Sequence, residues 1–159
     1  MEKKRVYVET SVISDLTAWP ASQPLHRHRQ LVTAEWWAHR WRWECILTRT
    51  VIAEIRRGDP AAAALRLETA RNLVELPITT EVNALADLLL ARKLVPPTAV
   101  TDAFHLAGAA FTRSDYLLTW NQKHLDNFDL RSRIEDLIRG WGLTPAKVIT
   151  PSRLLESAT

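Results

Sequence analysis

The stretch VYVETSVISDL, residues 6–16, determines how the rest of the chain is interpreted. Its first three residues are apolar, which predicts a short buried strand, and the residues Ser11–Thr17 have a helical pattern. Glu9 stands at the junction of the two elements. A strand that leads directly into a helix is typical of α/β folds, in which ligands bind beyond the carboxyl ends of the strands. The stretch therefore predicts an α/β protein with a carboxylate at its functional edge.

Short apolar runs alternate with helical patterns along the remaining chain. The runs are nearly continuous in hydrophobicity, as expected for a parallel sheet that is covered on both faces. The expected strands are Arg5–Glu9, Cys45–Thr48, Leu73–Leu76, Tyr116–Thr119 and Lys147–Ile149. The expected helices are Ser11–Thr17, Leu25–Trp43, Thr50–Arg57, Ala61–Asn72, Glu81–Lys93, Ala99–Thr112 and Leu130–Arg139. This order predicts a three-layer α/β/α architecture around a mainly parallel sheet of about five strands.

Length and composition are those of one globular domain over residues 1–159, with 47% hydrophobic and 25% charged residues. The single cysteine, Cys45, excludes an internal disulfide and a multi-cysteine zinc site. The chain has no apolar run of 18 residues and no signal-peptide pattern, so we expect a cytoplasmic protein without membrane association. The net charge of +3 weakly favours a polyanionic partner.

Three acids and one amide follow separate strands or begin helices. Glu9 ends the first expected strand, Glu54 lies on the helix after the second, Asp102 opens a strongly apolar helix, and Asn121 follows the fourth strand. These positions meet at one end of a parallel sheet. Clustered carboxylates repel each other unless a cation neutralises them, and an all-oxygen set suits Mg²⁺ or Mn²⁺.

Each of the four residues also has a structural alternative. Glu9 can cap the helix that follows it, and Glu54 can be a solvated partner of Arg57. Asp102 can complement a helix dipole, and Asn121 can serve as a turn residue. The convergence of all four, rather than any one of them, favours a functional site.

The order of four short motifs resembles that of the PIN-domain nucleases, and among them the VapC-type toxins of toxin–antitoxin pairs. The motifs are ETSVIS (9–14), TVIAEI (50–55), TDAFHLAGA (101–109) and YLLTWN (116–121). The resemblance extends from Val6 to Pro151. It implies a PIN-like domain that cuts single-stranded or structured RNA with Mg²⁺ or Mn²⁺. It also implies an antitoxin partner and a second copy of the chain in a homodimer.

The resemblance assigns roles by position. Glu9 stands where the family usually has its first aspartate, Glu54 matches the second acid, Asp102 the third, and Asn121 stands where many members have a fourth aspartate. Glu9 and Asp102 are then the expected metal ligands, Glu54 helps to orient the attacking water, and Asn121 completes the shell. Glu9 and Asn121 depart from the family pattern, so a catalytically weakened module that binds RNA or protein is the alternative.

Residues beside these four are candidates for contacting the RNA. They are Thr10, Ser11, Thr119, His124, Lys123 and Arg57. Helix and turn capping is the alternative for the three hydroxyl residues. His105 follows Asp102 by three positions on roughly the same helix face, but a lone histidine on an apolar helix is expected to be a core residue.

The segment 26–44 combines four tryptophans with several arginines and histidines. Trp37 and Trp41 share one helix face, which we expect to pack into the core or a dimer seam, and Trp36 and Trp43 share another. One small core cannot bury both faces. We therefore expect one face to contact a partner protein, in preference to RNA.

Overall fold

A computed structural model describes residues 2–158. Its centre is a five-stranded, entirely parallel sheet with the strand order β3-β2-β1-β4-β5. The strands are β1 (Arg5–Val8), β2 (Glu44–Thr48), β3 (Val74–Leu76), β4 (Tyr116–Leu118) and β5 (Lys147–Ile149). The register aligns Tyr7 with Ile46 on one side and with Leu117 on the other. The predicted strands are confirmed to within one or two residues.

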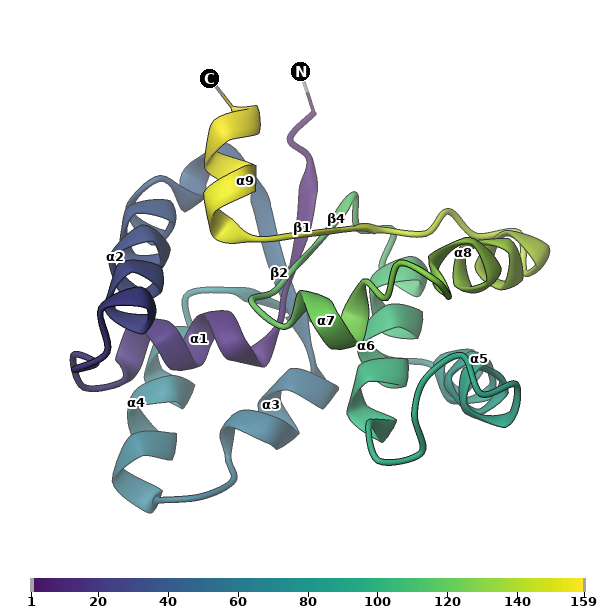
Figure 1. The fold of residues 1–159 in the computed structure, drawn as a ribbon, viewed down its shortest axis with the longest axis horizontal. Helices are drawn as coiled ribbons and strands as arrows, with labels where there is room; N and C mark the ends of the chain where they lie inside the picture. The colour runs from purple at the N-terminus through teal and green to yellow at the C-terminus, as the bar shows by residue number, and fades with distance from the viewer. Residues whose placement is uncertain (1, 159) are drawn as a thin grey trace.

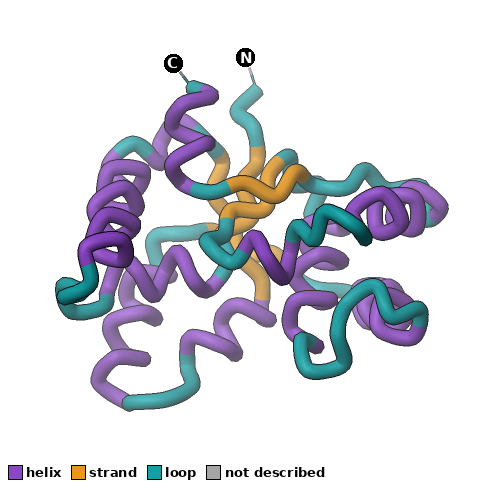
Figure 2. Tube along the Cα trace, in the orientation of Figure 1, coloured by secondary structure: helices purple, strands orange, loops and turns teal. Residues whose placement is uncertain are grey.

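Helices cover both faces of the sheet and one of its ends (Figures 1 and 2). The helices are α1 (Thr10–Thr17), α2 (Pro24–Ala38), α3 (Arg49–Ile55), α4 (Pro60–Ala70), α5 (Thr80–Ala91), α6 (Val100–Phe111), α7 (Gln122–Leu125), α8 (Arg131–Gly140) and α9 (Pro151–Ser157), with a 3₁₀ turn at Arg40–Arg42. Helices α1, α2, α4 and α9 lie on one side, and α5, α6 and α8 on the other (Figure 1). The three-layer α/β/α prediction is confirmed.

The core is formed by the strands and by the helix faces that meet them. Val6, Tyr7 and Val8 of β1 are fully buried, as is Leu117 of β4. Helix α6 is buried along most of its length, because it packs between the sheet and α5. Burial of β1 on both faces explains why its sequence is continuously apolar.

The predicted helix Leu25–Trp43 is shorter in the structure. Helix α2 ends at Ala38, and the chain passes through a 3₁₀ turn before Trp43 adopts an extended conformation that leads into β2. The His39 ring, through Nδ1, lies 2.9 Å from the Glu35 carbonyl oxygen, at the end of the helix. The short helices α7 and α9 were not predicted from the sequence.

The core alternative for Trp37 and Trp41 is wrong, and the alternative of a dimer seam stays a prediction. Trp36 and Trp43 are buried in the core, whereas Trp41 is 65% exposed and Trp37 is half-buried. The break after Ala38 is the physical reason, because Trp41 and Trp43 no longer continue the face that they would occupy on one straight helix. The guanidinium of Arg40 lies 4.0 Å from the centre of the Trp37 ring.

Candidate metal-binding site

Glu9 is fixed at the end of β1 by hydrogen bonds from its own helix and from the end of β4. Its backbone N–H donates to the Leu118 carbonyl (3.0 Å). Its Oε2 atom accepts hydrogen bonds from the Ser11 backbone N–H (3.0 Å), the Ser11 hydroxyl (2.5 Å) and the Thr119 hydroxyl (2.8 Å). Glu9 therefore caps α1, as one sequence alternative predicted. Within residues 2–158 its Oε1 atom accepts no hydrogen bond, so this oxygen is available to a ligand.

Glu54 approaches the same end of the sheet from α3. Its Oε1 atom accepts a hydrogen bond from the Thr10 hydroxyl (2.6 Å) and lies 2.5 Å from Nε2 of His105. The other ring nitrogen of His105 is 2.8 Å from the Tyr7 hydroxyl, which in turn is 3.0 Å from the Thr48 hydroxyl. A continuous hydrogen-bonded chain thus runs from the end of β2 through the core to Glu54.

The carboxylates form one cluster with His105. One ligand atom from each of Glu9, Glu54 and His105 lies within 4.8 Å of the others. Asp102, in the first turn of α6, adds a third carboxylate, and its Oδ2 atom is 3.9 Å from Nδ1 of His124. Asp102 lies outside that group of three, but the charges of Glu9 and Glu54 act on it. Helices α1, α3, α6 and α7 meet at the carboxyl end of the sheet (Figure 1).

The two acids Asp102 and Glu54 have opposite pKa shifts. Burial raises the pKa of Asp102, and the negative charges of Glu9 and Glu54 raise it further, although His105 and His124 act in the opposite direction. Burial also acts to raise the pKa of Glu54, but the hydrogen bonds from His105 and Thr10 and the charges of His105 and Arg57 together outweigh burial, so the pKa is lowered. Burial thus disfavours the ionised form of Asp102, whereas the contacts of Glu54 hold it in its ionised form.

The predicted hydroxyl residues contact the acids themselves. Thr10 donates to Glu54, and Ser11 and Thr119 donate to Glu9. The Thr119 hydroxyl also accepts the backbone N–H of Asn121 (2.9 Å). Asn121 occupies the N-cap position of α7 without a capping hydrogen bond from its side chain.

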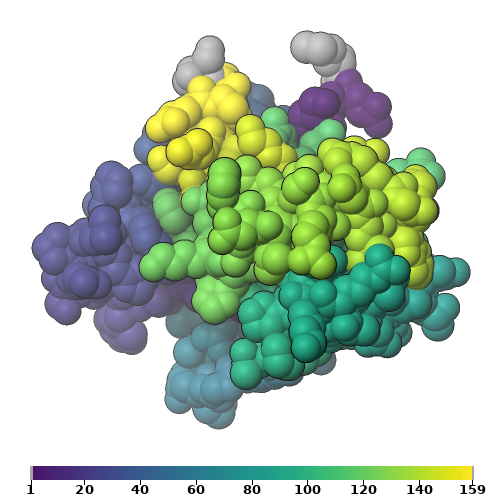
Figure 3. Space-filling view, turned by 45° about the vertical axis from the view of Figure 1, so that its right-hand side comes forward, coloured from purple at the N-terminus to yellow at the C-terminus, as the bar shows by residue number. Residues whose placement is uncertain are grey.

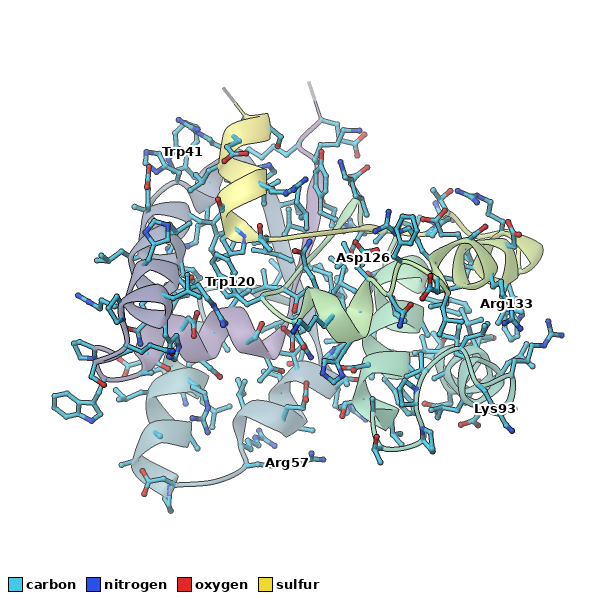
Figure 4. The ribbon with its side chains drawn as sticks, in the orientation of Figure 1. Trp41, Arg57, Lys93, Trp120, Asp126 and Arg133 are labelled. Carbon is cyan, nitrogen blue, oxygen red and sulfur yellow. The ribbon has the colours of Figure 1, made fainter. Side chains whose placement is uncertain are left out.

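Three of the predicted basic residues are exposed. Lys123 and His124 lie on α7, and Arg57 lies just after α3 (Figure 4). Lys123, His124, Lys93 and Asn127 contribute to the wall of a cavity of about 560 Å³. This cavity lies between α7 and the segment that follows α5, two parts of the chain that meet on the face shown in Figure 3.

His105 has a larger part in this site than the sequence suggested. It is fully buried, as expected of a core residue, but it also hydrogen-bonds to Glu54 and lies in the cluster. Its spacing of three residues from Asp102 was the available signal. The partner, Glu54, is 51 residues away in the sequence, and no local pattern identifies it.

Together, these features define an α/β/α protein with a cluster of carboxylates at the carboxyl end of a parallel sheet. Among residues 2–158, no helix combines the length and apolar character needed to cross a membrane.

Comparison with known proteins identifies a shared fold. No family model and no curated protein matches the chain. The crystal structure of Mycobacterium tuberculosis VapC20, a toxin that cleaves the sarcin-ricin loop, is similar, with a TM-score of 0.58 and 16% sequence identity. The similarity covers 75% of this chain and 92% of the VapC20 chain. At this identity it establishes the fold, so the resemblance to VapC-type toxins is confirmed at the level of the PIN-like fold.

Proposed function

We propose that the protein is a Mg²⁺- or Mn²⁺-dependent endoribonuclease that hydrolyses phosphodiester bonds in single-stranded or structured RNA, and that it is the toxin of a toxin–antitoxin pair. The observations that carry this proposal are the clustering of Glu9 and Glu54 at the carboxyl end of the sheet and the electrostatic effect of both acids on Asp102. The shared fold with VapC20 gives independent support.

The donor set fits a hard divalent cation. Glu9 Oε1, Glu54 Oε2 and both oxygens of Asp102 accept no hydrogen bond from the part of the chain that the structure describes. The ligands would be carboxylate oxygens, which Mg²⁺ and Mn²⁺ prefer. A cation would also stabilise the ionised form of Asp102, whose pKa is raised by burial and, to a smaller extent, by the charges of Glu9 and Glu54.

Glu9, Glu54 and Asp102 would hold the metal ion. When bound, the ion supplies charge neutralisation at the scissile phosphate and lowers the pKa of a coordinated water. Glu54, held ionised by its hydrogen bonds, is placed to orient the attacking water. Lys123 and His124 would bind the RNA backbone beside Asp102, and Arg57 would bind it on the α3 side; the 3.9 Å between His124 Nδ1 and Asp102 Oδ2 supports the first of these roles.

Two further partners belong to the proposal. One is an antitoxin protein, and the other is a second copy of this chain. Exposed apolar side chains, including Trp41, support contacts with protein on the α2 side of the molecule.

The direct test is cleavage of a mixed RNA pool by the purified full-length chain in Mg²⁺, in Mn²⁺ and in EDTA. We expect cleavage in either metal and none in EDTA. The variant Asp102→Asn should lose activity by on the order of 100-fold or more, because it removes a ligand charge. Asp87→Asn is the matched control, since Asp87 is an exposed acid on α5.

Two results would count against an enzyme. Cleavage that persists in EDTA or in Asp102→Asn would indicate a contaminating nuclease. Absence of cleavage from folded protein that binds RNA would favour the catalytically weakened module, for which Glu9 and Asn121 are the sequence departures.

A further inference from the structure

His105 uses both of its ring nitrogens inside the protein. The residue is fully buried, its Nε2 lies 2.5 Å from Glu54 Oε1, and its Nδ1 lies 2.8 Å from the Tyr7 hydroxyl. Tyr7 is also fully buried, and its ring meets the His105 ring edge-on at a centroid distance of 5.7 Å. Neither ring nitrogen of His105 is therefore accessible to water.

The direction of these hydrogen bonds follows from their partners. An ionised carboxylate accepts hydrogen bonds and cannot donate them, so Nε2 of His105 carries the proton that it shares with Glu54. A ring nitrogen that carries a proton has no lone pair for a metal ion. The Nδ1–Tyr7 contact is compatible with either protonation state, because a tyrosine hydroxyl can donate or accept.

The chain of hydrogen bonds ties Glu54 to the sheet. Tyr7 belongs to β1, and Thr48 ends β2, so both are buried in the central sheet. Helix α3, by contrast, has only seven residues, and Glu54 is in its last turn. Side chains on such short elements need outside contacts to hold one orientation.

We propose that His105 is a positioning residue that holds the Glu54 carboxylate through the Tyr7 relay, and that it is not itself a ligand of the metal ion. This inference rests on the proposed function, because it assigns Glu54 to the metal site. With Oε1 of Glu54 occupied by His105 and Thr10, the carboxylate presents Oε2 alone to the metal ion. The relay thereby selects which oxygen of Glu54 is used.

A test that does not depend on nuclease activity is nitrogen NMR of the full-length chain labelled with ¹⁵N-histidine. We expect Nε2 of His105 to carry a proton in a hydrogen bond, and Tyr7→Phe to shift the Nδ1 resonance of His105. A His105 ring protonated only at Nδ1 would overturn the proposal. In unlabelled protein with Mn²⁺ added, electron spin echo spectroscopy should detect no ¹⁴N of His105 directly coordinated to the ion, and a strong ¹⁴N coupling that is lost in His105→Gln would overturn the proposal.

Variants of His105 then test whether the orientation of Glu54 affects the rate of RNA cleavage. His105→Leu removes the donor to Glu54, whereas His105→Gln retains an N–H donor at a similar reach. We expect kcat for RNA cleavage to fall roughly 10–100-fold in His105→Leu with KM for RNA unchanged, and to recover most of that loss in His105→Gln. His28→Leu, on the exposed surface of α2, is the control.

Tyr7→Phe keeps the experiment decisive if His105→Leu fails to fold, because it deletes only one hydroxyl. We expect a smaller reduction of kcat, roughly threefold to tenfold, since one hydrogen bond of the relay is lost. Wild-type kcat in folded His105→Leu or in Tyr7→Phe would contradict the proposal, as would equal losses in the Leu and Gln variants. If the wild type cleaves RNA in neither metal but the NMR result is as expected, the proposed nuclease function is rejected. The hydrogen-bonded relay from Tyr7 through His105 to Glu54 is then still supported.

Discussion

Asp102 and Glu54 lie in one site, yet their ionised forms have opposite effects on folding. The pKa of Asp102 is raised in the folded protein, mainly by burial, so the folded state binds its proton more tightly than the unfolded chain does. The stability from this proton is present below the ordinary value of 3.8 and is lost as the pH rises through the folded pKa. At neutral pH the Asp102 carboxylate therefore destabilises the metal-free protein.

Asp102→Asn should consequently stabilise the protein in EDTA at pH 7, by about 1 kcal/mol in the free energy of unfolding. The gain should disappear below the ordinary aspartate pKa of 3.8, where the wild-type side chain is protonated. Urea unfolding at several pH values measures both effects. Mg²⁺ at 100 times its Kd should stabilise the wild type by about 2.7 kcal/mol and the variant by much less. A variant that is destabilised in EDTA would contradict this account of the site.

Glu54→Gln should change the free energy of unfolding in the opposite direction to Asp102→Asn. The pKa of Glu54 is lowered because the hydrogen bonds from His105 and Thr10 and the charges of His105 and Arg57 together outweigh the effect of burial. Its contribution to stability is present above the ordinary value of 4.5 and is lost as the pH falls through the lowered pKa. We expect Glu54→Gln to reduce the free energy of unfolding at pH 7 by about 1–2 kcal/mol, measured by urea unfolding in EDTA. An unchanged value would show that the His105 and Thr10 contacts contribute nothing.

At the scale of elements, α6 approaches the sheet closely at Gly108. A β-carbon added there would lie 3.4 Å from the ring of Tyr7, which is ordinary contact. Gly108→Ala should therefore fold normally and gain up to about 1 kcal/mol from helix propensity. Gly108→Leu should lose about 1–3 kcal/mol, because its branch meets Tyr7 and Thr48. Gly140→Leu is the matched control, since nothing lies within 4 Å of a β-carbon there; equal unfolding midpoints for the two leucine variants would disprove the close approach.

The sequence predicts elements well where burial fixes the pattern. The central strands β1 and β4 are apolar because they are buried, whereas the edge strands β3 and β5 are partly exposed and carry Glu75 and Lys147. The order of all five strands along the chain leads to the correct architecture. The helix Leu25–Trp43 was predicted too long, because the signal for its end at Ala38 lies in the tertiary burial of Trp36 and Trp43. Helices α7 and α9, with four and seven residues, are too short for a periodic pattern.

The site is predictable only in part, for a related reason. Glu9, Glu54 and Asp102 were found because each follows a recognisable strand or helix boundary. The relay through Tyr7 and His105 joins residues 98 positions apart, and each alone has the appearance of a core residue. Only the register of β1 with its neighbours and the placement of α6 bring them together.

At the scale of the whole molecule, exposed apolar residues flank the turn between α1 and α2. Trp19 is 91% exposed and Leu25 is 72% exposed. We expect self-association through this end, so the wild type should sediment as a dimer and the double variant Trp19→Ser with Leu25→Ser as a monomer. Phe128→Ser, which removes an 83% exposed side chain from the segment between α7 and α8, is the control. A monomeric wild type would reject the prediction.

The central claim is that carboxylates from three segments of the chain form one divalent-metal site. The most direct measurement is Mn²⁺ binding by the purified protein, followed by the loss of the free Mn²⁺ signal in electron paramagnetic resonance. We predict saturable binding by the wild type and by Asp87→Asn, weakened roughly tenfold or more in each of Glu9→Gln, Glu54→Gln and Asp102→Asn. Mn²⁺ binding that is absent from the wild type, or that survives unchanged in all three variants, would contradict the account.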